Sequence, residues 1–327
     1  YGADALRLYL ISSPVVRAED LCFTEEGVKQ SLRNLLLPWW NAYSFFVTYA
    51  RIDEWKPDGS PATSDNLLDR WILSSLERLT EDVVTAMDRY ELQQAVRPFV
   101  NFIDDLTNWY IRRSRRRFWK SKDDDDKRQA YATLYEVLLR LSKIAAPFVP
   151  FISDAIYRNL RTADMPESVH LCDFPEGTGQ GRDLDLEVQM RDVMSAVSLG
   201  RQLRTERNLK IRQPLAGLHV VCRDTERLER VKTLRDVVAD ELNVAEVWFG
   251  EHETELADLS AKANFSRLGP RLGPKMRAVA AAVQALGGEA CERLAEGESY
   301  EITVEGETLL LEPEDVQVQR TPKEGLA

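Results

Sequence analysis

Residues 112–117 hold five arginines in six positions, and four aspartates follow at 123–126. An arginine guanidinium is planar and always charged, and its forked donors match the two oxygens of a carboxylate or a phosphate. Trp109 and Trp119 flank the arginines. Guanidinium and indole planes both stack on unstacked bases. These residue types therefore suit the binding of an anion that also carries aromatic rings.

The arginines stand out because the chain as a whole is acidic. Its 327 residues include 43 Lys and Arg against 54 Asp and Glu, and the formal charge is −11. A protein that holds nucleic acid through bulk charge alone would have the opposite sign. The cations are instead concentrated in three basic segments, residues 108–122, 201–213 and 260–288, with seven, five and five cations and at most one acid each. These segments define the candidate binding surfaces.

A helix is expected to carry the first basic segment. Apolar residues recur before it at three- and four-residue steps, the spacing of one helix face. They are Phe99, Phe102, Ile103, Leu106 and Tyr110. Continuing the same stripe by three and four residues leads to Arg113 and Arg117. The other arginines point in different directions, because successive helical residues are about 100° apart.

Two interpretations of the arginines remain open. In the first, carboxylates of the same chain pair with them, since a buried guanidinium needs a partner. The acids nearby in sequence are Asp104, Asp105, Glu136 and the run at 123–126. We expect this pairing for one or two arginines, because all five would crowd the same few acids. In the second, the remaining arginines and the neighbouring aromatic residues face an outside polyanion.

The wider pattern predicts a mainly α fold followed by a smaller α+β domain. Apolar periodicity indicates an antiparallel helical bundle in the first half. The expected helices there are 5–10, 24–47, 67–90, 92–119, 128–146 and 152–160. Mixed elements follow, which is typical of a separate α+β domain. They are a helix at 184–208, a strand at 215–222, a helix at 225–241, a strand at 245–249, a loop rich in Gly and Pro, a helix at 274–286 and a hairpin at 300–312.

Other classes of protein find little support in the residues. The four cysteines lie far apart with no CxxC pair, and only three histidines accompany them, so neither a metal site nor a disulfide framework is expected. No histidine has a Ser, Cys or paired acid at motif spacing, and no catalytic residues are expected. No apolar run is long enough to span a bilayer and no secretory leader is present, so a cytoplasmic location is expected.

Several segments, in order along the chain, resemble the C-terminal part of isoleucyl-tRNA synthetases, which are class I aminoacyl-tRNA synthetases. They include YGADALRLYL, LLDRWILSSL, NWYIRRSRRRFW, RTERNLKIRQPL and NFSRLGPRLGPKM. NWYIRRSRRRFW is the most specific of these, because valyl and leucyl relatives share YGADALR and the bundle but not the arginine string. The resemblance covers nearly the whole chain, which opens at Tyr1 within a helical pattern and is expected to be a fragment.

The resemblance implies a division of the chain into four parts. Residues 1–20 would end the stem of the catalytic body, 21–165 would form the class Ia anticodon-binding helical bundle, and 166–183 would be a linker. Residues 184–327 would be an α+β C-terminal domain that is incomplete. The family's HIGH, KMSKS and editing motifs are not in the sequence. The chain alone is therefore expected to be inactive and to bind no cofactor or metal.

The resemblance also implies a partner. The longer enzyme would attach isoleucine to its tRNA with ATP and Mg²⁺, and this part would bind that tRNA as a monomer, without DNA or membrane. The candidate tRNA-binding residues are Trp109, Arg112, Arg113, Arg115, Arg116, Arg117, Trp119, Lys210, Arg212, Gln213, Arg267, Arg271 and Lys275. The last three lie among glycines and prolines that would let RNA approach the backbone.

Each later segment also has a structural interpretation. KIRQPL could simply end a helix and begin a strand, and RLGPRLGPK could pack within its domain. For the chain as a whole, two alternatives stay open. One is a helical protein-interaction module whose arginines are paired internally, and the other is the equivalent part of a valyl- or leucyl-tRNA synthetase.

Overall fold

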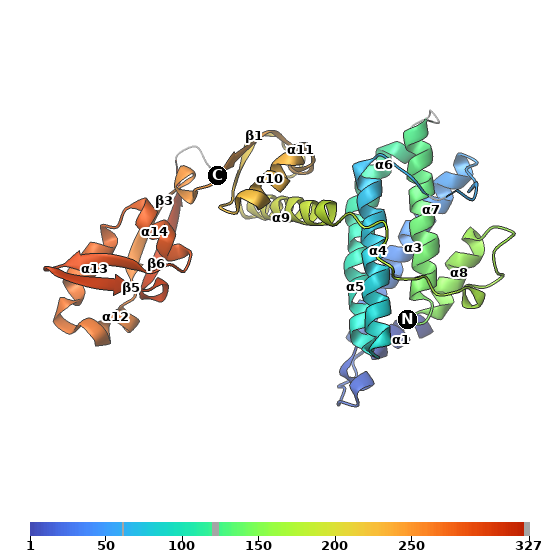
Figure 1. Ribbon diagram of the computed structural model, residues 1–327, viewed down its shortest axis with the longest axis horizontal. Helices are drawn as coiled ribbons and strands as arrows, with labels where there is room; N and C mark the ends of the chain where they lie inside the picture. The colour runs from blue at the N-terminus through green and yellow to red at the C-terminus, as the bar shows by residue number, and fades with distance from the viewer. Residues whose placement is uncertain (61, 120–123, 324–327) are drawn as a thin grey trace. The chain divides into compact units, whose positions relative to one another are not determined.

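A computed structural model describes residues 1–60, 62–119 and 124–323 (Figure 1). The chain divides into two compact units, Tyr1–Glu187 and Val188–Ala327, called here the first and second units. Lys120 and Lys122 of the first basic segment and Asp123 of the acidic run lie outside the described residues. Within the described ranges, no helix combines the length and apolar character that a membrane crossing requires.

The first unit is a helical bundle, in which α3, α4, α5 and α7 pack lengthwise around a shared core (Figure 1). Its largest fully buried side chains include Trp39, Ile72, Tyr110, Tyr131 and Leu138. The α-helices are α1 (Ala3–Ile11), α2 (Glu25–Ser31), α3 (Leu37–Ile52), α4 (Leu67–Asp88), α5 (Leu92–Asp104), α6 (Arg112–Trp119), α7 (Asp125–Ala145) and α8 (Pro150–Leu160). Short helical segments are η1 (Pro14–Arg17), η2 (Leu32–Leu36), η3 (Asp105–Ile111) and η4 (Val169–Leu171).

Polar side chains fix where the helices of the first unit begin. The Thr24 hydroxyl accepts a hydrogen bond from the Gly27 amide, so α2 starts where the sequence predicted. Asn66 and Asp124 accept amide hydrogen bonds in the same way at the starts of α4 and α7. Each cap satisfies one of the amides that a helix N-terminus leaves without an intrahelical partner. The predicted helices of the bundle are thus present, with α7 beginning three residues early at Asp125.

The helix predicted at 92–119 is a continuous run of three segments, α5, η3 and α6. The middle segment η3 is π-helical, with wider turns than the α-helices on either side. The same interruption occurs at η2, between α2 and α3. Such a segment shifts the phase of the side chains that follow it, and periodicity in the sequence does not reveal it.

Asp105 begins η3 and is largely removed from solvent. Desolvation raises the pKa of its carboxyl to about 6, while Arg78 opposes this rise and Asp104 adds to it. As pH rises, the carboxyl therefore ionises in the unfolded chain before it ionises in the folded one. The folded state loses stability as pH rises from about 4 to about 6.

We expect Asp105→Asn to stabilise the first unit at pH 7 by about 1–2 kcal/mol. One pKa unit is worth about 1.4 kcal/mol, and remaining solvent contact reduces the full value. The asparagine keeps the shape and removes the charge, so the advantage should vanish below about pH 4. Urea denaturation of both proteins at pH 4, 5.5 and 7 measures this. A stability difference that does not change with pH would contradict it.

The first twenty residues belong to the first unit. The Asp4 carboxylate accepts hydrogen bonds from the Phe151 and Ile152 amides, at 3.3 and 2.7 Å, at the start of α8. Arg7 donates to the carbonyl oxygens of Pro147 and Phe148. An acid at a helix N-terminus is stabilised by the amides and the helix dipole. The finer boundaries predicted at residues 20, 165 and 183 stay predictions.

The second unit, as far as it is described (188–323), contains α9 after its first turn and three two-stranded sheets. Its helices are α9 (Leu184–Glu206), α10 (Thr225–Thr233), α11 (Arg235–Leu242), α12 (Phe265–Leu272), α13 (Met276–Gln284) and α14 (Gly288–Ala295), with η5 (Glu253–Glu255), η6 (Gly273–Lys275) and η7 (Pro313–Asp315). Its strands are β1 (Leu215–Val221), β2 (Val244–Gly250), β3 (Ala257–Ala263), β4 (Tyr300–Val304), β5 (Glu307–Leu311) and β6 (Val316–Pro322).

The sheets of the second unit are partly as predicted. β1 and β2 pair in parallel, with Leu215 opposite Val244, and α10 and α11 connect them. β4 and β5 form the predicted hairpin, and Glu305 and Gly306 turn it with φ angles of 53° and 82°. Positive φ at both turn residues is the geometry that a two-residue hairpin favours.

Three features of the second unit correct the sequence predictions. The helix expected at 225–241 is two helices that break at Leu234. The loop expected before residue 274 instead contains β3 and α12. Leu268 of α12 is fully buried in the core of the unit, which holds this segment as a helix. β3 pairs antiparallel with β6, a strand that the sequence prediction omitted. β6 begins with VQVQ, and this alternation of apolar and polar residues is the sequence pattern that indicates a strand.

Candidate nucleic-acid interface

Arg117 anchors α6 to the bundle and is not open to an outside ligand. Its two terminal nitrogens each lie 2.7 Å from an oxygen of Asp69, in a bidentate pair, and Asp69 is fully buried. The Tyr110 and Ser64 hydroxyls donate to the same carboxylate, at 2.7 and 2.6 Å. Burial alone would lower the pKa of Arg117, but hydrogen bonding to Asp69 raises it above its ordinary value.

The internal pairing expected for one or two arginines is therefore present at Arg117. Its main partner, Asp69 of α4, was not among the predicted acids, although Asp126 was and lies 2.8 Å from the Arg117 Nε. Bidentate arginine–carboxylate geometry adds orientation as well as energy. We correct the assignment of Arg117 as a tRNA contact, because its guanidinium is consumed in fixing α6.

Trp109 is also part of the core. It is 4% exposed, so its ring is not available to stack on a base. The guanidinium carbons of Arg112 and Arg113 lie 5.9 and 5.8 Å from the centre of its ring, within the range of cation–π attraction. The positions three and four residues along a helix lie on the same side, which brings these arginines over the indole. The prediction of Trp109 as a stacking surface is corrected accordingly.

Four residues of α6 form a solvent-facing surface, called here the α6 arginine face. They are Arg112, Arg115, Arg116 and Trp119. All four are exposed, and Trp119 keeps 55% of its surface. Arg112 donates through Nε to the Asn108 carbonyl, which directs its side chain along the helix. Among the described residues, no carboxylate lies within ion-pair distance of Arg115 or Arg116. Arg113 is half-buried beside this face.

In the second basic segment, a buried arginine holds the loop from which the candidate side chains project. Arg204, 5% exposed, donates to the carbonyl oxygens of Lys210, Gln213 and Leu242, at 2.9, 3.0 and 2.6 Å. Asn243 donates to the Ile211 carbonyl of the same loop. The loop predicted after α9 is present, and the side chains of Lys210, Arg212 and Gln213 are exposed. Its backbone is fixed while its polar side chains face solvent.

We expect Arg204→Gln to destabilise the second unit by about 2 kcal/mol. The change removes the donor from buried carbonyl groups, and each unsatisfied group costs about 1–3 kcal/mol before relaxation. Amide hydrogen exchange at residues 209–213 should accelerate together with the fall in stability. Arg207→Gln, which alters an exposed arginine in the turn directly after the same helix, is the matched control and should leave both unchanged. Equal behaviour of the two variants would show that Arg204 does not hold the loop.

The third basic segment is paired within the second unit. Arg267 lies 3.5 Å from carboxylate oxygens of Glu312, Glu314 and Asp315. Arg271 lies 3.0 Å from the fully buried Asp315.

Lys275 completes the pairing, because its Nζ lies 2.6 Å from Glu307. The segment is helical where a Gly- and Pro-rich loop was expected, so its backbone is not open to RNA. The predicted tRNA contacts Arg267 and Arg271 are corrected to ion pairs with the buried Asp315, which would lose its partners if they turned to RNA. The Lys275–Glu307 pair is exposed on both sides, so the assignment of Lys275 stays a prediction. These acids lie far along the sequence and were not considered as partners.

Comparison with known proteins relates the chain to a protein family. Residues 69–221 match the family model described as "Anticodon-binding domain of tRNA ligase". The chain thus carries an anticodon-binding domain of the tRNA ligases. Over its full length it is homologous to the C-terminal region of isoleucine–tRNA ligases, as its sequence motifs indicated.

Two relatives illustrate this similarity. The isoleucine–tRNA ligase of Protochlamydia amoebophila is 49% identical over 326 residues, and that of Treponema denticola is 45% identical over 339 residues. Each match covers 100% of this chain and 31% of the relative, so the chain spans about a third of their length. A solved ternary complex of Agrobacterium radiobacter K84 agnB2 LeuRS, tRNA and LeuAMS shows 17% identity and a TM-score of 0.40, over 56% of this chain and 20% of that chain. That likeness is too low to bear on the fold.

Proposed function

We propose that this chain is the tRNA-binding, anticodon-reading part of an isoleucine–tRNA ligase. The observation that carries the proposal is the α6 arginine face, where cations and an exposed indole project from a rigidly anchored helix. Guanidinium groups suit phosphate oxygens, and the Trp119 ring offers a surface for an unstacked base. The family match and the names of the relatives support a tRNA partner of this kind.

Two surfaces divide the work of binding in this proposal. Arg115 and Arg116 hold phosphates of the anticodon arm while Trp119 stacks on a base. Lys210, Arg212 and Gln213, on their fixed loop, make a second contact with the same RNA. The attachment of isoleucine would take place in another part of the longer protein. These contacts would therefore contribute to recognition of the tRNA and not to the chemical step.

The longer protein would supply the catalytic steps. No residue of this chain is assigned to ATP or Mg²⁺, and the HIGH and KMSKS sequences are not in it. Among the described residues, no group of three or more His, Cys, Asp or Glu is arranged to hold a metal ion. We therefore propose that the chain alone does not activate isoleucine. From the resemblance to isoleucyl-tRNA synthetases, we also propose that it acts as a monomer in the cytoplasm.

The first alternative, a helical protein-interaction module whose arginines are paired internally, is less well supported. Arg117 and the third basic segment are paired as that alternative requires, whereas Arg115, Arg116 and the side chains of Lys210 and Arg212 have no carboxylate partner among the described residues. The valyl and leucyl alternative is disfavoured because the two relatives described above, each matched over the whole of this chain, are isoleucine–tRNA ligases.

A filter-binding titration tests the proposal. The chain is titrated with isoleucine, valine and leucine tRNAs over a range of salt concentrations. We expect tightest binding to isoleucine tRNA, with log affinity falling by about 0.7–0.9 per phosphate contacted for each unit of log salt. Absence of salt-dependent binding to any of the three RNAs would overturn the proposal, and preference for valine or leucine tRNA would overturn its specificity.

A further inference from the structure

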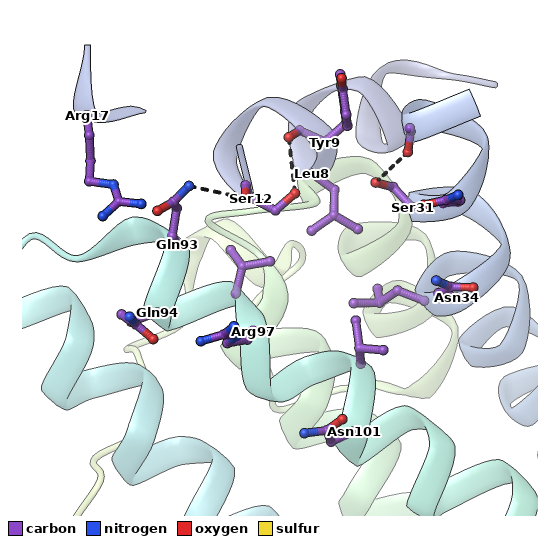
Figure 2. Close-up of a pocket in the computed structure, with 15 residues that line it drawn as sticks. Leu8, Tyr9, Ser12, Arg17, Ser31, Asn34, Gln93, Gln94, Arg97 and Asn101 are labelled. Atoms are coloured by element: carbon purple, nitrogen blue, oxygen red, sulfur yellow. Dashed lines mark hydrogen bonds between the residues drawn. The ribbon is translucent and has the colours of Figure 1, made fainter. Parts of the chain in front are cut away.

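A polar groove runs along α5 and leads to the α6 arginine face. Two hollows of about 750 and 640 Å³ share Asn34, Val100 and Asn101 in their linings, so they form one continuous groove. One wall is α5, η3 and the start of α6, and the other is the run from α2 to α3. Figure 2 shows the first hollow, with Gln94 and Asn101 along α5 and Asn34 on the opposite helix.

Side-chain amides line both walls, and we name this feature the amide groove. One wall carries Gln94, Asn101 and Asn108, and the other carries Gln30, Asn34 and Asn41. All six are exposed. Gln94 and Asn101 lie seven positions apart within α5, nearly two helical turns, so they share one face of that helix. The other four amides are placed in the groove by the linings of the two hollows. The sequence does not reveal this pattern, because the two sets of amides meet only when the two helices lie side by side.

The charged residues of the amide groove are mostly cationic. Arg17, Arg33, Arg97 and Arg115 line it, against Asp104 alone among acids. Arg17 and Arg33 form exposed pairs with Glu19 and Glu26, at 3.6 and 3.5 Å. Exposed pairs of this kind are weak and do not prevent exchange for a phosphate. Arg115 belongs also to the α6 arginine face, so the groove and that face are continuous.

The chemistry of the amide groove favours an RNA strand over other occupants. An amide both donates and accepts hydrogen bonds, as a ribose 2′-hydroxyl does. The spaced arginines match the phosphates between successive riboses. Apolar side chains such as Leu35, Val96 and Phe45 also line the groove, but polar and charged side chains lie among them. An amphipathic protein helix would need a continuous apolar floor. DNA offers the phosphates without the hydroxyls.

We propose that the amide groove holds a ribose–phosphate strand of the anticodon arm, and that its amides hydrogen-bond the 2′-hydroxyls. The inference rests on the proposed function, because the RNA is that of the proposed tRNA partner. It adds a further binding surface to the α6 arginine face and the loop at 210–213, and it gives a physical basis for choosing RNA over DNA.

The test couples a change in the protein to a change in the RNA. Asn34→Ala/Asn101→Ala removes the two amides shared by both hollows. Ser44→Ala/Thr85→Ala alters two exposed positions of α3 and α4 outside the groove and is the matched control. Each protein is titrated with an anticodon arm made wholly of ribonucleotides and with one whose stem riboses are 2′-deoxy. Thermal melting confirms that the variants fold.

We expect the groove variant to bind the ribonucleotide arm about tenfold more weakly than the wild type, and the control to bind within about twofold of it. With the deoxy arm, wild type and groove variant should bind alike. If the wild type binds RNA but the groove variant matches it, or deoxy substitution weakens both equally, the groove inference is wrong and the proposed function stands. If the wild type binds neither arm, both fail.

Discussion

Asp69→Ala should lower the free energy of unfolding of the first unit by about 3–5 kcal/mol. Removing one partner of a buried ion pair leaves an uncompensated charge, which is strongly destabilising. Here the change leaves the buried guanidinium of Arg117 without its bidentate partner, and Tyr110 and Ser64 lose their acceptor as well. Urea denaturation followed by circular dichroism measures the loss.

Two further variants sharpen this test. Asp65→Ala changes an exposed acid four residues away and should alter stability by less than about 0.5 kcal/mol. Asp69→Leu combined with Arg117→Met replaces both charges by apolar groups and should cost less than Asp69→Ala. A loss below about 1 kcal/mol for Asp69→Ala would mean that the pair does not anchor α6.

Arg115→Ala/Arg116→Ala should weaken tRNA binding by about 30- to 100-fold at low salt and leave the melting temperature unchanged. Each lost phosphate contact lowers the slope of log affinity against log salt by about one, so the slope should fall by about one to two. Stability should hold, because no carboxylate among the described residues pairs with either side chain. Filter binding at several salt concentrations, together with thermal melting, measures both quantities.

Arg267→Ala/Arg271→Ala is the matched control for this pair. It removes two positive charges, as Arg115→Ala/Arg116→Ala does, but from residues that pair with Asp315 and its neighbours. It should therefore reduce the stability of the second unit and leave the salt slope of tRNA binding unchanged. The prediction for Arg115 and Arg116 would be contradicted if both double variants changed the slope equally.

Local patterns in the sequence were enough to predict much of the first unit. Long amphipathic repeats gave the bundle helices, and the Thr24 cap gave the start of α2. The apolar stripe continues to Arg113 and Arg117, which are the two least exposed of the five arginines at 112–117. Each of these features depends on residues within one or two turns of one another. The Glu305–Gly306 turn of the hairpin is equally local.

The features that the sequence did not reveal depend on contacts between distant residues. Asp69 lies 48 positions before Arg117, and only the packing of α4 against α6 brings them together. β3 and β6 are separated by the whole of α12 to η7. The acids that pair with the third basic segment lie in and just after the β4–β5 hairpin, more than 30 positions along the chain, which made that segment look like a free cationic surface.

Photo-crosslinking at position 119 tests most directly whether the α6 arginine face meets the RNA. Trp119 is replaced by benzoylphenylalanine, which keeps an aromatic side chain at an exposed site, and Thr85 of α4 is replaced in the same way as a reference. Irradiation with isoleucine tRNA should give a crosslink from position 119 to the anticodon loop and none from position 85. A crosslink to the acceptor end, or equal yields from both positions, would contradict the assignment of α6 as the RNA-facing helix.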